Sequence, residues 1–279
     1  MGLEGAGNKA INYDGGAIYC QPSTVFSMNY SSGIIQYNEA GQHGGALALG
    51  GTATATMTAG TISHNKAGIQ GGGIYIPSNA TLNISGSAVI SDNDATGQGG
   101  GVYVAGTMNV SAGSLAVRNN TINGSVPCNV YLLSGKTINV NGDGFDPEYL
   151  GIYTVQTTTP IPVITGTAAR LGTIYAAMQA NTMDVFDDKQ LYSPNYTSGQ
   201  TTIYFENASP WSLLQQQARA SSDLHIQDGV CQISDVKSLT AFLWYVNGIT
   251  KHSSETEFST THASAQGVLT ADIDMGSHY

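Results

Sequence analysis

The side chains best suited to acid–base chemistry are two carboxylates that stand close together in the sequence. Asp92 and Asp94 flank Asn93, and Arg118 follows about one repeat later, beside Asn119. Glycosidases need paired carboxylates, and lyases need a carboxylate-bound cation with a basic residue on the same face. If the chain is an enzyme, its candidate catalytic residues are therefore Asp92, Asp94 and Arg118, although residues in such positions more often lie in solvated turns.

Acidic residues gather at two other places in the sequence. The first group consists of Asp143, Asp146 and Glu148, and the second of Asp184, Asp187 and Asp188. The first group could form a weak Ca²⁺ loop but lacks the ligand spacing of a known calcium motif, and the second is more often a solvated turn. No two histidines stand at helical metal-binding spacing, and no C-x-x-C occurs. We therefore expect no cofactor, with Ca²⁺ at the first group as the weak exception.

A column of tyrosines offers a candidate ligand-binding surface. The column consists of Tyr19, Tyr75, Tyr103 and Tyr131. Each tyrosine alternates with apolar neighbours, so if those neighbours point inward the tyrosines are exposed. Exposed tyrosines are good anchors for ligands and could stack on sugar rings. The alternative is that the rings stack on one another and seal an edge or a neighbouring loop.

The tyrosines belong to a motif, Gly-Gly-x-apolar-Tyr-apolar, that recurs five times at a spacing of about 28 residues, with some copies degenerate. Its first apolar residue falls at positions 18, 47, 74, 102 and 130. A regular period in this range is typical of a solenoid, in which each unit stacks only on its neighbours.

Each repeat contains three short segments with strand character. Residues 81–85 read Thr-Leu-Asn-Ile-Ser, and similar alternating segments stand at 54–58, 107–111 and 137–141. Alternation of polar and apolar residues is the period of a strand with one buried face. Three strands in about 28 residues leave no room for a helical crossover, so we expect an all-β, single-stranded parallel β-helix with three strands per coil.

An asparagine ends the third segment of each repeat and predicts an asparagine ladder. The residues are Asn38, Asn65, Asn93 and Asn120. Asparagine tolerates the left-handed conformation of a tight turn, and its amide can bond the copies above and below. The glycine pairs are interpreted as corner residues, because they lack the helix and lysine that a phosphate-binding loop needs.

Charge and composition limit the class of partner. The net charge is −10, and residues 143–279 carry fourteen acidic against five basic residues. No basic stripe indicates nucleic acid, and no run of 18 apolar residues predicts a membrane span. The first residues show no signal peptide, so the chain is interpreted as a fragment of a longer protein whose adjoining domains would be partners.

The chain divides into four parts by sequence character. Residues 1–142 are the regular coils, and 143–206 are expected to continue and close the β-helix irregularly. Residues 207–222 are expected to be a linker or a short helix. Residues 223–279 are expected to open a small α+β second unit, with a strand at 230–233, a helix at 234–248 and a strand at 267–275.

Two stretches resemble known families. Residues 12–142, with "GGGIYI" and "ATLNISGSAVISDN", resemble the glycine-rich right-handed β-helix repeats of bacterial adhesin-like surface proteins, including the polymorphic outer-membrane type. Residues 143–206 resemble the segment that often follows such repeats, with 162–166 the clearest match. Residues 230–279 are similar to the opening of a GLUG-type surface domain. The resemblance implies a right-handed coil in a secreted or surface-displayed bacterial protein, and it carries over no catalytic residues.

Three functional hypotheses follow. The first is a non-enzymatic, adhesin-like surface module that serves attachment or binds a polysaccharide or host-surface ligand. The alternative is a polysaccharide lyase or glycoside hydrolase of the pectate-lyase-like β-helix class, which rests on fold analogy. An ice-binding face at residues 54–58 ranks lowest, because the T-x-T pattern is not continued in the other coils.

Overall fold

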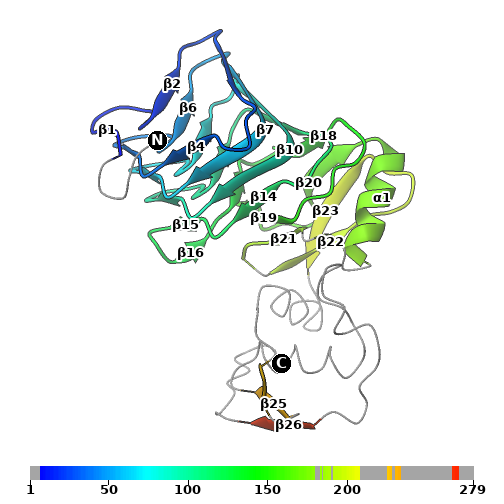
Figure 1. The fold of residues 1–279 in the computed structure, drawn as a ribbon. Helices are drawn as coiled ribbons and strands as arrows, with labels where there is room; N and C mark the ends of the chain where they lie inside the picture. The colour runs from blue at the N-terminus through cyan, green and yellow to red at the C-terminus, as the bar shows by residue number, and fades with distance from the viewer. Residues whose placement is uncertain are drawn as a thin grey trace.

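The computed structural model of the protein describes residues 7–179, 183, 185–189 and 191–207, and the strand segments 225–227, 230–233 and 266–269. The repeats form a parallel β-solenoid, so the predicted fold class is confirmed (Figure 1). Equivalent strands of successive coils pair in parallel with the register that the sequence period predicts. Leu82, for example, pairs with Met108 of the next coil.

Three faces of the solenoid are built from these pairings. The first face carries the Tyr motif and comprises β2 (Ile18–Cys20), β6 (Leu47–Leu49), β9 (Ile74–Ile76), β12 (Val102–Val104) and β17 (Val130–Leu132). The second comprises β3 (Val25–Met28), the first halves of β7 (Thr54–Ser63) and β10 (Thr81–Ser91), β13 (Thr107–Val110), β18 (Ile138–Val140) and β20 (Ile161–Gly166). The third comprises β4 (Ile34–Gln36), the second halves of β7 and β10, and β14 (Ala116–Arg118).

A fourth, two-residue strand follows the third face in each coil and was not predicted. These strands are β1 (Lys9–Ala10), β5 (Glu39–Ala40), β8 (Lys66–Ala67), β11 (Asp94–Ala95) and β15 (Thr121–Ile122), with β16 (Val126–Pro127) antiparallel to β15. Their shortness explains why alternation did not reveal them. They form a separate sheet that starts immediately after each ladder asparagine.

The core runs along the axis of the coils. Leu82, Ile84, Met108 and Val110 point inward and are 2% exposed or less, while Asn83 between them is half-buried on the outer side. Removing such side chains from water stabilises the fold by about 1.5–3 kcal/mol each. The inward positions therefore hold successive coils together.

The elements after residue 142 depart from the regular coils and form a mixed cap. The cap region contains β19 (Tyr149–Thr154), β21 (Val185–Asp187), α1 (Ala168–Gln179), β22 (Tyr192–Asn195) and β23 (Thr202–Asn207). β19 and β21 still pair in parallel with the coils, whereas β23 is antiparallel to both β20 and β22. Figure 1 shows α1 beside β20 and β23, at the end of the coils away from the N-terminus.

Helix α1 was not predicted, although its signals are present in the sequence. Thr167 precedes it and accepts a hydrogen bond from the backbone N–H of Arg170 at 3.4 Å. Leu171, Ile174 and Met178 follow at helical spacing and are buried in the main core. The helix thus covers the end of the apolar interior.

Three short strands lie further along the chain. They are β24 (His225–Gln227), β25 (Val230–Ile233) and β26 (Gln266–Leu269). β25 pairs in parallel with β26 and antiparallel with β24. The expected linker or short helix at 207–222 lies outside the described residues except for Asn207, which ends β23, and the expected helix at 234–248 lies outside them entirely.

Candidate functional site

The predicted asparagine ladder is present at the corner after the third face. The side-chain Nδ2 of each asparagine donates to Oδ1 of its equivalent in the next coil, at 2.8 Å from Asn38 to Asn65, 2.9 Å from Asn65 to Asn93 and 2.9 Å from Asn93 to Asn120. The backbone N–H of each donor bonds the same Oδ1. All four asparagines are buried, so the ladder satisfies polar groups that would otherwise be costly inside the protein.

The ladder is longer than the sequence period indicated. Asn8 starts it by donating to Asn38 at 3.0 Å, and Asn120 donates to Asn129 at 3.0 Å. Asn129 in turn bonds Asp188, which ends the ladder. One detail of the prediction is wrong: the left-handed conformation belongs to the residue before each ladder asparagine. These residues are Tyr37, His64, Asp92 and Asn119, with φ of 56–57°.

The candidate catalytic residues lie on neighbouring coils, where the backbone N–H of Asp92 donates to the carbonyl of Arg118 at 3.3 Å, but their charged groups have different surroundings. Arg118 forms an ion pair with Glu148 at 3.2 Å. Asp94 accepts hydrogen bonds from Thr121 and Gly124, while Asp92 is exposed at its corner. Within the described part of the chain, the guanidinium of Arg118 pairs with Glu148 and with neither Asp92 nor Asp94. An acid–base pair for the lyase or glycosidase hypothesis is therefore not assembled at this corner.

The candidate calcium ligands are also separated. Asp143 is paired with Arg170 and Glu148 with Arg118, and within the described ranges no three His, Cys, Asp or Glu side chains, Asp146 included, form a metal-binding group. These contacts give no support to a Ca²⁺ loop at residues 143–148, which stays a prediction. The ion pairs form because each acidic residue lies about one coil from a basic residue.

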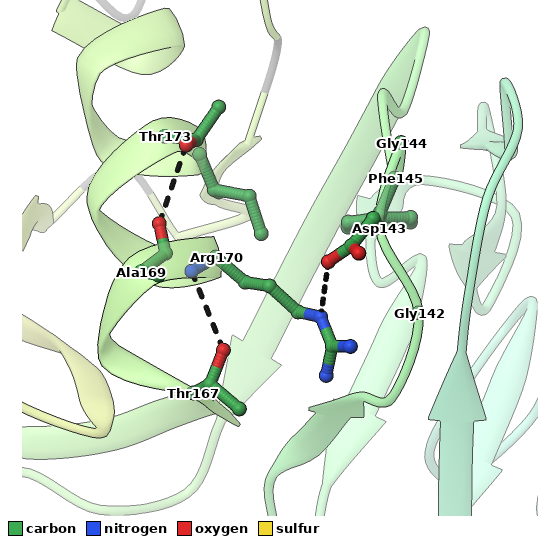
Figure 2. Close-up of a pocket in the computed structure, with 9 residues that line it drawn as sticks. Gly142, Asp143, Gly144, Phe145, Thr167, Ala169, Arg170 and Thr173 are labelled. Atoms are coloured by element: carbon green, nitrogen blue, oxygen red, sulfur yellow. Dashed lines mark hydrogen bonds and ion pairs between the residues drawn. The ribbon is translucent and has the colours of Figure 1, made fainter.

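A small pocket separates the 142–145 loop from helix α1 (Figure 2). Its volume is about 310 Å³. The guanidinium of Arg170 lies across it, and Nε donates to Asp143 at 2.5 Å. The Asp143 side chain is 85% exposed, and such pairs contribute at most about 1 kcal/mol. Because the charged groups of this pocket satisfy each other, it offers a ligand little beyond apolar contact.

The tyrosine column is largely covered, which corrects the expectation that its members are exposed. Tyr103 and Tyr131 are 6% and 5% exposed, Tyr75 is half-buried, and Tyr19 alone is 44% exposed. Their alternation with inward apolar residues was read correctly, but the outward side chains lie against Ala105, Cys128, Ile122 and Leu133 rather than in water. The tyrosines thus build a second, smaller core.

The rings of the column stack on one another along the solenoid axis. Ring centroids are 5.5 Å apart from Tyr75 to Tyr103 and 5.3 Å from Tyr103 to Tyr131. His43 extends the stack at one end at 4.4 Å, and Tyr153 extends it at the other at 5.6 Å. We call these five residues the aromatic stack. Both ring faces of its inner members are occupied, so a sugar ring cannot stack on them.

Tyr19 stays outside the aromatic stack because the next coil has Ala48 at the equivalent position. The gap is filled by His43, whose ring comes from the preceding glycine-rich turn. The backbone N–H of His43 donates to Asp14 at 3.1 Å. Burial lowers the pKa of His43, and the charge of Asp14 opposes this. Sequence reasoning could not place His43 in the stack, since it lies outside the repeated motif.

A larger pocket lies where the aromatic stack ends, and we call it the stack-end pocket. Its volume is about 520 Å³, within the usual range for small-ligand sites. Its lining includes Tyr131, Tyr153, Thr154, Lys189 and Tyr192. No pattern in the sequence predicts this pocket, because Lys189 and Tyr192 come from the irregular region after the last regular coil.

Lys189 is the cation of the stack-end pocket. Its Nζ donates to the carbonyl of Thr154 at 2.7 Å. It also lies 5.4 Å from the ring centroid of Tyr153 and 4.8 Å from that of Tyr192, within the range of cation–π attraction. The hydroxyl of Thr154 is buried and has no hydrogen-bond partner among the described residues. The pocket therefore offers a fixed ammonium beside two phenol rings, whereas the Thr154 hydroxyl is enclosed by the protein.

Two carboxylates lie buried beside this pocket. Asp187 accepts hydrogen bonds from the backbone N–H groups of Leu191 and Tyr192. Burial raises the pKa of Asp187, while these hydrogen bonds and the charge of Lys189 act to lower it. Burial also raises the pKa of Asp188 to about 7, although the hydrogen bonds from Asn129 oppose the rise. Asp187 and Asp188 are thus structural carboxylates and not the solvated turn expected. Asp184 lies outside the described residues.

No helix in the described part of the chain is both long and apolar enough to span a bilayer. Comparison with protein-family models, with curated proteins and with solved structures gives no match to this chain.

Proposed function

We propose that this chain is a non-enzymatic, adhesin-like module of a secreted or surface-displayed bacterial protein, and that it binds a polysaccharide in the stack-end pocket. The observation that carries the proposal is the pocket itself, in which the Thr154 carbonyl holds Lys189 close to the rings of Tyr153 and Tyr192.

The chemistry of the pocket suits a saccharide. Sugar hydroxyl groups both donate and accept hydrogen bonds, so they can pair with an ammonium and with phenol groups at once. The aromatic edges supply apolar contact for the sugar C–H groups. A volume of about 520 Å³ suits one or two sugar residues of a longer chain.

The rest of the solenoid supports a scaffold role. The repeated residues are used in the asparagine ladder, the aromatic stack and the axial core, all of which hold coils together. Of the residues named for catalysis, Arg118 pairs with Glu148, and Asp94 accepts hydrogen bonds from Thr121 and Gly124. Surface display and bacterial origin rest on the resemblance of residues 12–142.

The test is a binding screen on neutral and acidic polysaccharides, followed by calorimetry on three variants. Lys189→Gln and Tyr153→Phe each change one polar group of the pocket lining, and Lys136→Gln is the matched control away from it. We expect at least a tenfold loss of affinity for the pocket variants and none for the control.

Product chain length is measured in the same samples, with and without Ca²⁺. Unchanged chain length supports a binding module. Shortened chains would overturn the non-enzymatic assignment, and binding that is insensitive to both pocket variants would overturn the pocket assignment. Thermal unfolding of each variant ensures that lost affinity is not lost folding.

A further inference from the structure

The stack-end pocket contains a cation that has no ion-pair partner among the described residues. Lys189 is half-buried in the pocket lining, and its Nζ donates to the carbonyl of Thr154. An ammonium has three N–H donors, so this carbonyl uses only one of them. None of the ion pairs of the described residues includes Lys189. Because a partly buried charge is stabilised by an opposite charge, the pocket favours a ligand with an anionic group.

Asp187 is the nearby carboxylate, but it is enclosed in the protein. Its Oδ2 accepts hydrogen bonds from the backbone N–H groups of Leu191 and Tyr192, and its side chain is 0% exposed. It forms no ion pair with Lys189, although the charge of Lys189 acts on its pKa. The ammonium of Lys189 is thus left to a group that enters the pocket from outside.

Gln98 gives the pocket lining a second polar group whose orientation is fixed. Oε1 of Gln98 accepts a hydrogen bond from Nε2 of Gln70 at 2.7 Å. The two residues also pair through their backbones, so they stand at equivalent positions of neighbouring coils. Since Oε1 of Gln98 is held by Gln70, the amide NH₂ of Gln98 is the group that can serve a ligand in the pocket. An NH₂ donor of this kind suits a carbonyl oxygen.

Apolar side chains of the same lining are exposed to solvent. Val155 and Leu191 are 42% and 52% exposed, and Ile122, which also lines the pocket, is partly buried. Covering such side chains removes apolar surface from water and is favourable. A methyl group on the ligand is small enough to do so inside a pocket of about 520 Å³.

Resting on the proposed function, we infer that the stack-end pocket selects a sugar unit that carries both a carboxylate and an acylamino group. The carboxylate pairs with the ammonium of Lys189, and the acyl carbonyl accepts a hydrogen bond from Nε2 of Gln98. The acyl methyl group packs against Val155 and Leu191. A sugar that lacks both substituents keeps only the contacts of its ring and hydroxyl groups with the tyrosines, which the proposed function already requires.

The test is a calorimetric titration of the full chain with four methyl glycosides at one ionic strength. The sugars are the glucoside, the glucuronide, the N-acetylglucosaminide and the N-acetylglucosaminuronide, so carboxylate and acetamido groups are varied independently. We expect the N-acetylglucosaminuronide to bind about tenfold more tightly than either singly substituted sugar, because each substituent adds a hydrogen bond or an ion pair.

Two variants connect each preference to its residue. Lys189→Gln should abolish the preference for carboxylated sugars and keep the preference for acetylated ones, and Gln98→Leu should do the reverse. Gln98→Ala repeats the second test with a smaller side chain. Lys136→Gln, outside the pocket lining, should keep both preferences. A purely structural effect would weaken the binding of all four sugars together, and thermal unfolding of every variant identifies it.

The inference is overturned if the parent chain lacks either preference, or if a preference survives the variant that should remove it. Equal binding of all four sugars, weakened throughout by Tyr153→Phe, would overturn the inference and leave the proposed function standing. If none of the four sugars binds, or if Tyr153→Phe, Lys189→Gln and Gln98→Leu all leave binding unchanged, the pocket is not a sugar site and both proposals fail.

Discussion

Asp188 accepts two hydrogen bonds from Asn129, whose backbone N–H and Nδ2 lie 2.6 and 2.8 Å from its two carboxylate oxygens. At the earlier steps of the ladder, a single Oδ1 receives both bonds, as Asn120 does from Asn93. The hydrogen bonds of the ladder therefore all point in one direction along the solenoid. The last acceptor is a group that, when ionised, only accepts hydrogen bonds. A carboxylate suits this end, because it has no amide N–H left without a partner.

This arrangement predicts stability that depends on pH. Burial raises the pKa of Asp188 to about 7 in the folded chain, whereas an unfolded aspartate titrates near 3.9. The folded state thus binds the proton more tightly than the unfolded state does. Protonated Asp188 therefore contributes its full stabilisation of the fold below about pH 4, and this contribution is lost as the pH rises through about 7. We expect the free energy of unfolding to fall by on the order of 4 kcal/mol across this range. Urea titrations at pH 4 to 8 measure it.

The matched variant is Asp188→Asn. Asparagine can receive both donors on Oδ1, as at the other ladder positions, and it has no charge to bury. We expect the variant to lose most of the fall between pH 4 and 7, with a smaller fall left from Asp187, whose pKa is also raised by burial. An unchanged pH profile in Asp188→Asn would show that other groups cause the dependence.

A second prediction concerns the middle of the ladder. Asn93 donates through Nδ2 to Asn120 and to the carbonyls of Ile62 and Ser91, and it accepts two bonds from Asn65. Asn93→Ala leaves these buried groups unpaired, and each costs about 1–3 kcal/mol. We expect a loss of roughly 4 kcal/mol or more in the free energy of unfolding, measured with urea.

Asn83→Ala is the control for that substitution. Asn83 is half-buried on the outer side of β10, and its Oδ1 accepts a hydrogen bond from Nδ2 of Asn109. We expect a loss of at most about 1 kcal/mol, because solvent can replace that bond. Equal losses in the two variants would mean that the ladder contributes no more than an ordinary surface amide.

A third prediction compares two tyrosines of the same column. Tyr103 is 6% exposed between Tyr75 and Tyr131, whereas Tyr19 is 44% exposed and outside the aromatic stack. Tyr103→Ala should destabilise the chain by about 3–5 kcal/mol through the cavity that it leaves. Tyr19→Ala should cost about 1 kcal/mol or less. Near-ultraviolet circular dichroism should change strongly for the first variant and weakly for the second.

The regular part of the fold could be predicted from the sequence because every coil repeats the same pattern of inward apolar and outward polar residues. Leu82 and Met108 stand at the same place in successive repeats, so period and alternation together predict both strand register and burial. The ladder asparagines were predictable for the same reason. A feature that occurs only once cannot be recognised from the repeat. Helix α1 and the end of the ladder at Asp188 are two such features.

The exposure of the tyrosines could not be predicted, for a different physical reason. Alternation along a strand assigns a side chain to one of two faces, but it does not say what covers the outer face. Here Ile122 of the fourth strand and Cys128 of the following corner cover Tyr103 and Tyr131. The stack-end pocket depends on Lys189 in the same way, since it is brought there by a segment with no repeat.

The last prediction concerns how closely the backbones of neighbouring coils approach. A Cβ placed on Gly72 would lie 2.3 Å from the carbonyl oxygen of Gly100 and 2.4 Å from that of Asp94, so Gly72→Ala must push two coils apart. We expect a loss of about 1–3 kcal/mol in the free energy of unfolding, as for other overpacked positions.

The control is Gly124→Ala, where φ is +68° but no atom lies within 4 Å of the added Cβ. That change should cost about 1–2 kcal/mol through backbone conformation alone, without altering contacts between coils. Hydrogen exchange separates the two mechanisms: amides of the neighbouring strands β9 and β12 should exchange faster in Gly72→Ala and at the parent rate in Gly124→Ala. Parent-like exchange at β9 and β12 in both variants would mean that the coils absorb a Cβ at Gly72 without separating.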